Sequence, residues 1–402
     1  MPGGADSTNP GSGAIQHVVM PKWGLSMKTG RITEWLVAEG DTIEKGADLV
    51  EIDTDKIAGT LESTESGVLR RIVAGPGTDA PVGCTLALVA PAEVAEADIE
   101  RAVRVAEEQL ADGTPQSADG PTEGTVEVAG RRIAYCVMEK EGGQEKQGDR
   151  ESQENQRVPE GQGADDMSVT VLVHGYGGDK NSWLFVQEPL SAGHRVYALD
   201  LPGHGDSAKD VGDGGLETLA ATVTGFLDAL GIGRAHLVGH SLGAAVATAV
   251  AARVPSRVRS LTLVAPAGFG VPVDPGYLRG FATAATRREL RPYLAQLFAD
   301  PGQANRQLVD DVLRYKRLDG VATALNTLLD TVLALDVTAL PPGATPAVAV
   351  WGTADRVIPH SGAAALPAGC ALHKAEGAGH MVHMEAPGAV VTAVREAYRL
   401  AD

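Results

Sequence analysis

AHLVGHSLGAAVATAVAARV, residues 235–254, is the stretch that decides the fold of the larger part of this chain. The apolar run AHLV leads into Gly-His-Ser-Leu-Gly at residues 239–243, and an Ala-rich run of helical character follows at once. This order predicts a buried strand, a sharp turn and a helix, with Ser241 at the turn. Glycines on both sides let the backbone approach closely in such a turn. The hydroxyl of Ser241 is then exposed at the edge of a sheet, where it can react as a nucleophile.

Three more stretches run as an apolar strand that ends in a loop of small or polar residues: SVTVLVHGYGG, RVYALDLPGHGDS and AVAVWGTADRVIP. Helix-like segments such as GLETLAATVTGFLDALG separate them. Strands that alternate with helices predict a mostly parallel sheet covered on both faces. Ahead of them, TVEVAGRRIAYCVME is typical of two strands joined by a turn at Ala129-Gly130.

A serine is a weak nucleophile until a base removes its proton, so a histidine and an orienting carboxylate are expected after Ser241. Asp355 lies just after the strand AVAVWG, and His380 lies in the loop EGAGHMVHMEAP before a helix. The order Ser, Asp, His matches the order in which a strand–turn–helix nucleophile takes its partners. We expect the backbone N–H groups of Tyr176 and Leu242 to stabilise a developing oxyanion.

The pattern leaves other residues open for the same roles. His383 is an alternative base, although it is expected to begin the following helix, and His240 is expected to point away from the site. Asp330 and Asp336 are alternative carboxylates, but neither follows a strand. The remaining polar loop residues, which we interpret as structural, are His174, His204 and Asp200.

The N-terminal part repeats itself. GRITEWLVAEGDTIEKGADLVEI (30–52) aligns without a gap with GVLRRIVAGPGTDAPVGCTLALV (67–89). Two matching halves predict a small pseudo-symmetric β-sandwich or flattened barrel. EIDTDKIAGTLES lies between the halves and is expected to form a hairpin with Asp55 and Lys56 at its turn. A lysine there extends its amine into solvent, where an enzyme can modify it.

The chain therefore divides into an N-terminal domain, a linker and a larger domain. Residues of the linker can form a charged amphipathic helix followed by flexible coil. The expected ranges are 1–15 for a disordered lead-in, 16–90 for the β-domain, 91–124 for the linker, 125–402 for the larger domain, 139–166 within it for a disordered acidic insert, and about 268–340 for a helical cap that selects the substrate.

Composition excludes several classes of protein. A formal net charge of −18 argues against nucleic-acid binding, which needs clustered positive charge. The three cysteines Cys84, Cys136 and Cys370 are far apart and form no CxxC pair, so we expect neither a disulfide framework nor a metal site. Neither a secretory signal nor a membrane-spanning stretch is apparent, and we expect a cytoplasmic protein.

The repeated segment resembles the lipoyl domains of 2-oxo-acid and acetoin dehydrogenase complexes. The matching residues are EGD at 39–41, Gly46, the DTDKI turn at 53–57 and Gly67. Biotin-carrier domains share this fold but typically place Met on both sides of the target lysine. The residues that flank Lys56 are Asp55 and Ile57, which favours lipoate. The resemblance thus implies an all-β lipoyl domain with lipoate covalently bound to Lys56.

Residues 125–402 resemble the α/β-hydrolase superfamily through HGYGG, DLPGHGDS, GHSLG, GTADRVIP and GAGHMVHMEAP. Together the two domains resemble the dihydrolipoamide acetyltransferase component of acetoin dehydrogenase complexes. That resemblance implies transfer of acetyl from lipoyl-Lys56 to coenzyme A. It also implies two partners, a thiamine-diphosphate enzyme that cleaves acetoin and a flavin-dependent dihydrolipoamide dehydrogenase, and an oligomeric core.

One departure is informative. Acyltransferases of pyruvate-type complexes carry an H-x-x-x-D-G motif near the C-terminus, and this sequence has none. The coenzyme A site therefore stays unlocated. Two other functions are the alternatives: a lipoyl-bearing serine esterase or thioesterase, and a lipoyl carrier whose α/β-hydrolase body is a catalytically unused scaffold.

Overall fold

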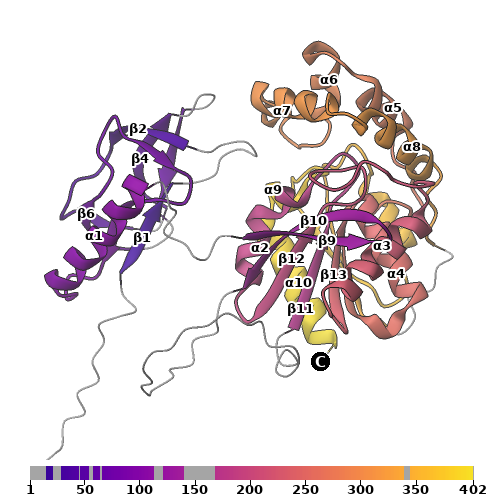
Figure 1. Cartoon of the computed structure of the whole chain (residues 1–402), viewed down its shortest axis with the longest axis horizontal. Coiled ribbons are helices and arrows are strands. Elements are labelled where there is room, and N and C mark those ends of the chain that lie inside the picture. The colour runs from indigo at the N-terminus through magenta and orange to yellow at the C-terminus, as the bar shows by residue number, and fades with distance from the viewer. Residues whose placement is uncertain are drawn as a thin grey trace, which may run out of the picture. The chain divides into compact units, whose positions relative to one another are not determined.

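The computed structural model describes residues 15–20, 29–44, 46–53, 58–63, 66–112, 121–139, 168–338 and 345–401. The chain forms two compact units, Met1–Gly120 and Pro121–Asp402 (Figure 1). No described helix is long and apolar enough to cross a membrane. All three cysteines are free.

The first unit is a sandwich of two four-stranded antiparallel sheets, with strand orders β1-β8-β6-β3 and β5-β4-β2-β7. Its strands are β1 (Gln16–Val19), β2 (Thr29–Trp35), β3 (Thr42–Ile43), β4 (Asp48–Asp53), β5 (Ala58–Glu62), β6 (Gly67–Ile72), β7 (Asp79–Pro81) and β8 (Thr85–Ala90).

The sequence repeat becomes a structural repeat. The first copy holds β2, β3 and β4, and the second copy holds β6, β7 and β8. Each sheet pairs two strands of one copy with the short strand of the other, β4-β2-β7 and β8-β6-β3. Gly40 and its counterpart Gly77 have φ of 96° and 85°, a conformation that glycine adopts without strain. The predicted pseudo-symmetric sandwich is confirmed.

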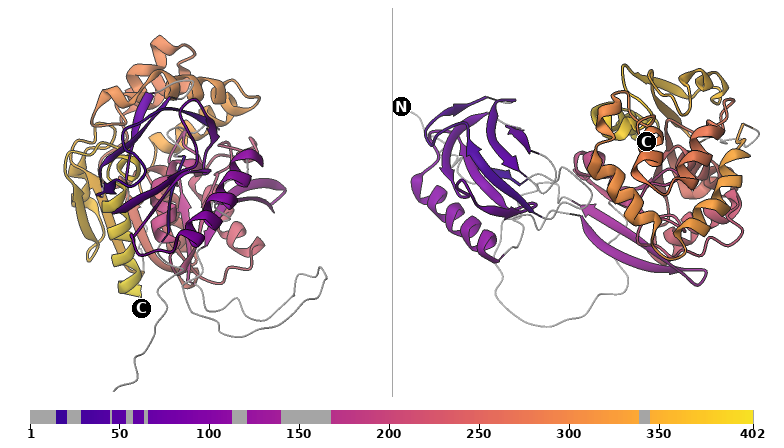
Figure 2. Two further views of the ribbon diagram at one scale, coloured as in Figure 1. Left: turned by 90° about the vertical axis from the view of Figure 1, so that its left-hand side faces the viewer. Right: turned by 90° about the horizontal axis from the view of Figure 1, so that it is seen from above.

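Among its described residues, this unit has one helix. α1 (Glu96–Asp112) covers much of the segment that the sequence analysis assigned to the linker. It buries Ile99 in an apolar cluster with Leu88 of β8. Glu96 forms ion pairs with Arg70 and with Arg71 of β6. α1 therefore packs against the sandwich (Figure 2) and extends this unit beyond the lipoyl-like repeat.

The second unit is built on an eight-stranded sheet of order β16-β15-β14-β13-β11-β12-β10-β9. From β11 to β16 neighbouring strands are parallel, and β10 pairs antiparallel with both β9 and β12. The strands are β9 (Thr122–Val128), β10 (Arg131–Glu139), β11 (Ser168–Val173), β12 (His194–Leu199), β13 (Ala235–His240), β14 (Val258–Val264), β15 (Ala347–Gly352) and β16 (Ala371–Ala375).

Two pairs of helices cover the sheet, α2 with α10 and α3 with α4. Their bounds are α2 (Leu184–Leu190), α3 (Leu216–Ala229), α4 (Leu242–Arg253) and α10 (Pro387–Ala401), with the short α9 (Val382–Glu385) ahead of α10. β13 and β15 are buried along their whole length, as expected of central parallel strands between two helical layers. The predicted doubly covered, mostly parallel sheet is confirmed.

The hairpin at the start of this unit follows its turn residues. β9 and β10 pair in register, with Val128 opposite Arg131. Ala129 and Gly130 between them have φ of 49° and 75°, the left-handed pair of a tight hairpin turn. After β10 the chain enters residues 140–167, which include nearly all of the expected acidic insert and lie outside the described residues.

In the described part of the chain between β14 and β15, where the sequence predicted a cap, there are four α-helices. They are α5 (Pro275–Thr283), α6 (Arg287–Leu294), α7 (Arg306–Lys316) and α8 (Val321–Leu333). They lie together above the end of the sheet (Figure 1). Because their apolar faces join the main core through residues such as Leu278 and Leu290, the cap is packed onto the body.

Candidate active site

Ser241 lies on a strained turn between β13 and α4. Its φ and ψ are 51° and −114°, a conformation that a residue with a side chain adopts only when its surroundings impose it. The residues on either side of the turn must be glycines because there is no room for a side chain at these positions. A Cβ on Gly243 would overlap the carbonyl oxygen of Val173, and one on Gly239 would overlap the backbone of Gly243. This turn stores strain and presents the serine at the end of the strand.

Asp355 and His380 form a hydrogen-bonded pair. Asp355 follows β15, and its Oδ2 lies 2.8 Å from Nδ1 of His380. Its other oxygen, Oδ1, accepts from the backbone N–H groups of Val357 and Ile358, each at 2.8 Å. The carboxylate is thereby fixed in orientation. Because Nδ1 donates to Asp355, Nε2 of His380 is left as the proton acceptor.

The alternative bases are placed elsewhere. His240 donates from Nε2 to the backbone carbonyl of His380 at 3.0 Å, so it supports the loop of the predicted base. His383 is fully buried, and among the described residues neither of its ring nitrogens has a hydrogen-bond partner. Burial lowers the pKa of His240 well below its usual value and that of His383 to about 3. Both histidines are therefore neutral at physiological pH.

The alternative carboxylates are also separate from the pair. Asp330 lies in the cap helix α8. Asp336 accepts from the backbone and the hydroxyl of Thr338, which lowers the pKa of Asp336. Ser241 itself makes no side-chain hydrogen bond to any described residue, so the serine and His380 are not yet hydrogen-bonded. Such contacts often form only when substrate is present.

The two backbone N–H groups predicted as oxyanion donors are not used in hydrogen bonds to other described residues. Among the described residues, no group accepts a hydrogen bond from the backbone N–H of Tyr176 or of Leu242. Leu242 is the first residue of α4, where the helix dipole also favours negative charge. Tyr176 lies in the loop after β11. Its hydroxyl donates to the carbonyl of Leu325 in the cap at 2.9 Å.

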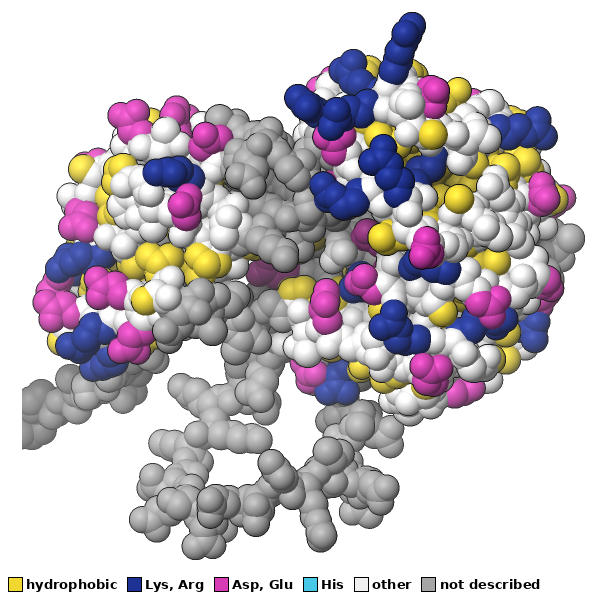
Figure 3. Space-filling view, turned by 45° about the horizontal axis from the view of Figure 1, so that its top comes forward, with side chains coloured by type: hydrophobic (Ala, Val, Ile, Leu, Met, Phe, Trp, Pro, Cys, Tyr) yellow, Lys and Arg dark blue, Asp and Glu magenta, His cyan; other side chains and the backbone are white. Residues whose placement is uncertain are grey.

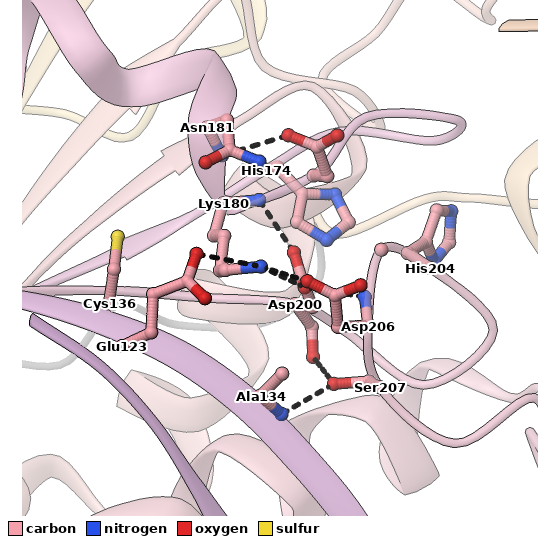
Figure 4. Close-up of polar contacts among 12 residues, drawn as sticks. Glu123, Ala134, Cys136, His174, Lys180, Asn181, Asp200, His204, Asp206 and Ser207 are labelled. Atoms are coloured by element: carbon pink, nitrogen blue, oxygen red, sulfur yellow. Dashed lines mark hydrogen bonds and ion pairs between the residues drawn. The ribbon is translucent and has the colours of Figure 1, made fainter. Parts of the chain in front are cut away.

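Two histidines, His174 and His204, which Figure 4 labels, bind the backbone in and around the loop that carries Tyr176. His204 accepts from the backbone N–H of Gly177 at 3.0 Å, and His174 accepts from that of Leu201 at 2.9 Å. His174 donates in turn to the carbonyl of Gly175 at 2.7 Å. Burial lowers the pKa of both histidines, which keeps them neutral and able to accept. The structural role predicted for them is thus the positioning of the loop 175–178.

A buried ion pair lies beneath this loop (Figure 4). Asp200 is fully buried and accepts from the backbone N–H of Lys180 at 2.6 Å. The ammonium of Lys180 lies 3.3 Å from Asp200 and also contacts Asp206. Asp200 accepts from the backbone N–H of Asp206 at 2.8 Å, which fits the structural role predicted for it. Sequence reasoning missed Lys180, whose only signal is the pair of aspartates in DLPGHGDS.

Hydrogen bonds connect the cap to the two loops that carry Asp355 and His380. The backbone N–H of His380 donates to the carbonyl of Leu297 at 2.8 Å. Glu385 accepts from the N–H of Ala299 at 2.7 Å and from that of Gly379 at 2.8 Å. Arg356, next to Asp355, donates to the carbonyl of Phe298. Sequence reasoning missed both Arg356 and Glu385, because backbone contacts leave no pattern in side-chain types.

The target lysine of the first unit, Lys56, lies outside the described residues, as does the whole segment 54–57. The residues on either side are informative. β4 and β5 pair antiparallel with Asp53 opposite Ala58, so the segment connects the two ends of one hairpin. Asp53 is exposed to solvent. This setting fits a lysine that a modifying enzyme must reach.

Two protein families match the two units. Residues 16–89 match the family described as Biotin-requiring enzyme. Residues 169–387 match the family described as alpha/beta hydrolase fold. The second match includes Ser241, Asp355 and His380.

Two curated relatives are similar along nearly their whole length. A dihydrolipoyllysine-residue acetyltransferase component of an acetoin cleaving system from Pseudomonas putida is 44% identical over 386 residues, covering 92% of this chain and 95% of that protein. The protein of the same description from Cupriavidus necator is 40% identical over 380 residues, covering 93% of this chain and 95% of that protein.

Solved structures are similar in fold alone. A membrane phospholipase A is 24% identical with a TM-score of 0.56, and the match covers 76% of this chain and 92% of the phospholipase. A 2-hydroxy-6-oxo-6-phenylhexa-2,4-dienoate hydrolase from Rhodococcus is 18% identical with a TM-score of 0.57, covering 70% of this chain and 99% of the hydrolase.

Proposed function

The chain belongs to the family of dihydrolipoyllysine-residue acetyltransferase components of acetoin cleaving systems, and we propose that Ser241 carries the acetyl group between the lipoyl arm and coenzyme A. The observation that carries the proposal is that the relatives match through both units, so an arm and an α/β-hydrolase body occur in one chain. An acetyltransferase of this family needs a covalent arm and a transfer centre, and the chain has a candidate for each.

The arm is the first unit, with lipoate attached to Lys56. Bound lipoate supplies a thiol that holds the acetyl group as a thioester. The hairpin of β4 and β5 fits this attachment because Asp53, the last residue of β4, is exposed and lies opposite Ala58.

In the first half of the reaction the Oγ of Ser241 attacks the carbonyl carbon of the acetyl thioester. His380 accepts the serine proton at Nε2, and Asp355 holds the resulting imidazolium through the 2.8 Å contact. The backbone N–H groups of Tyr176 and Leu242 stabilise the oxyanion. The C–S bond then breaks, the departing thiolate takes the proton from His380, and the acetyl group is left as an ester on Ser241.

In the second half the thiol of coenzyme A attacks this ester. His380 takes the thiol proton and returns it to the serine oxygen as the C–O bond breaks. Acetyl-coenzyme A leaves and Ser241 is restored. Both halves use the same base and the same oxyanion donors, and no oxidant or reductant takes part.

Membership of the family makes the chain one component of a multienzyme system. The chemistry on either side of the transfer indicates the other components. One must cleave acetoin and deliver acetyl to the arm, which is chemistry that thiamine diphosphate performs. Another must reoxidise the reduced arm, which requires a flavin-dependent dehydrogenase. A cytoplasmic, oligomeric assembly with these two enzymes completes the proposal.

The experiment that tests the function is product analysis from acetyl-dihydrolipoamide, with and without coenzyme A. The proposal predicts acetyl-coenzyme A as the product and little acetate in its absence. Free acetate formed at one rate regardless of coenzyme A would identify a thioesterase instead. Transfer that survives Ser241→Ala unchanged would show that the triad is unused. Intact-mass analysis of the protein from its native host tests the arm, and an unmodified Lys56 would refute that part.

A further inference from the structure

One segment of the cap, residues 279–317, carries net positive charge, whereas the whole range 268–340 has eight basic and eight acidic residues. From Arg279 to Arg317 the sequence has eight Lys and Arg against four Asp and Glu, in a chain whose net charge is −18. Lys and Arg side chains gather on the face of the larger unit that shows the cap helices (Figure 3). Such a local reversal of charge attracts anions to one place on the molecule.

The acidic residues of this segment are already engaged within the cap. Glu289 accepts from the backbone N–H groups of Ala285 and Thr286 at the start of α6, and Asp300 accepts from that of Gly302. Asp310 pairs with Arg287, and Asp311 pairs with Arg314. Each of these carboxylates thus has a hydrogen-bond or ion-pair partner within the cap.

Four arginines of this segment form no ion pair with a carboxylate among the described residues. One of them, Arg291, donates to the backbone carbonyl of Ala304, and the side chains of the other three make no such hydrogen bond to a described residue. Arg279, Arg288 and Arg317 are exposed, and among the described residues no carboxylate forms an ion pair with any of them. A guanidinium presents its donors in a rigid, planar fork and is the side chain best suited to phosphate oxygens. These three residues, the arginine patch, are free to bind an anion.

The arginine patch lies around one corner of the cap. Lys316 donates from Nζ to the carbonyl of Ala284 at 2.6 Å, so the end of α7 lies against the end of α5. Arg317 follows Lys316 directly. α6 begins just after Ala284, with Thr286 as its capping residue. The helices that carry Arg279 and Arg288, and the end of α7 next to Arg317, therefore meet at this junction.

The corner lies on the outer side of the helix that covers the predicted oxyanion loop. α5 buries Tyr277 and Phe281 on its inner side. The ring of Phe281 lies 5.9 Å from that of Tyr176 and would meet a Cβ placed on Gly177. Arg279 lies on the exposed side of the same helix. A helix with its side chains is about 10 Å across, so about that distance separates the exposed side of α5 at Arg279 from the loop.

This arrangement matches the shape and charge of coenzyme A. Its anionic end carries a diphosphate and a 3′-phosphate on adenosine, and its thiol lies at the far end of a long, uncharged pantetheine chain. We propose that Arg279, Arg288 and Arg317 bind the phosphates of coenzyme A, while the pantetheine chain passes the cap to bring the thiol to Ser241. The proposal rests on the proposed function and locates the second substrate.

The binding test uses adenosine 3′,5′-bisphosphate as the probe, measured by equilibrium titration with the full-length lipoylated protein. We expect saturable, salt-sensitive binding, and a double variant Arg279→Glu/Arg288→Glu that weakens it more than tenfold. A single exposed charge pair contributes up to about fivefold, and reversal of two charges exceeds this. The matched control is Arg399→Glu on α10, outside the cap, which leaves binding unchanged. Equal binding by the double variant and the wild type would overturn the proposal.

The kinetic test separates this proposal from the proposed function. We expect the double variant to raise KM for coenzyme A more than tenfold, with kcat and the KM for acetyl-dihydrolipoamide unchanged. With pantetheine, which lacks the phosphates, the variant and the wild type should have the same KM. A KM that rises for the acetylated lipoyl domain instead of coenzyme A would show that the patch docks an acidic protein. If the wild-type protein binds adenosine 3′,5′-bisphosphate but transfers no acetyl group, the proposed function is refuted and the binding site is not.

Discussion

The buried histidine beside the predicted base makes the stability of the second unit depend on pH in a calculable way. The ring of His383 packs against that of Trp183, tilted by 36° with centroids 4.7 Å apart, and also against the ring of His240 at 4.4 Å. Burial lowers the pKa of His383 from 6.5 to about 3. The folded state therefore binds no proton on this ring until strongly acid pH, whereas the unfolded chain binds one below 6.5.

The stability that neutral His383 contributes is fully present above pH 6.5 and is lost as pH falls from 6.5 towards 3. A pH of 5 lies about 1.5 units below the pKa of His383 in the unfolded chain, so the free energy of unfolding is lower there by roughly 2 kcal/mol. His383→Gln removes this titration. We therefore expect the variant to lose roughly 2 kcal/mol less than the wild type between pH 7 and pH 5.

The assay is urea unfolding of the full-length protein at both pH values, followed by tryptophan fluorescence because Trp183 contacts the ring. Comparing each protein with itself at pH 7 separates the packing cost of the substitution from its effect on titration. An identical pH dependence in the variant and the wild type would refute the burial of His383 as a neutral ring.

Three further predictions concern the turn, the cap and the buried ion pair. Gly243→Ala forces a Cβ onto the carbonyl of Val173, so we expect about 3 kcal/mol of destabilisation or more, measured by chemical unfolding, and an unchanged stability would contradict the turn geometry. Glu385→Ala leaves two backbone N–H groups of the cap and base loops without their acceptor, and we expect kcat to fall about tenfold in steady-state assays with the fold retained by circular dichroism. The hydrogen bond from Lys180 lowers the pKa of Asp206, so its contribution is present above the usual carboxyl pKa and is lost as pH falls through the lowered pKa; Asp206→Asn should lower Tm more at pH 7 than at pH 3.

The fold was predictable wherever a local pattern sets the backbone. The paired glycines Gly40 and Gly77 revealed the repeat because each needs a left-handed turn at the same place in its half. Ser241 was identifiable because only glycines fit around its turn. Asp355 and His380 followed from their places after a strand and before a helix, and the structure brings their side chains to 2.8 Å.

Other features were not predictable because they depend on contacts between distant segments. α1 was expected in a linker, but Ile99 and the ion pairs of Glu96 bind it to the sandwich. The burial of Lys180 depends on two aspartates supplied by another loop. Glu385 acts on backbone groups of the cap, and no spacing of side-chain types in the sequence marks such a contact.

The central claim is that the acetyl group passes through Ser241. The most direct measurement mixes the purified protein with acetyl-dihydrolipoamide, without coenzyme A, and maps acetylation by peptide mass spectrometry after a rapid quench. The account predicts an acetyl ester on the peptide that contains Ser241, its discharge as acetyl-coenzyme A when coenzyme A is added, and its loss in Ser241→Ala. Acetyl-coenzyme A formed at the wild-type rate with Ser241 never acetylated would contradict the account.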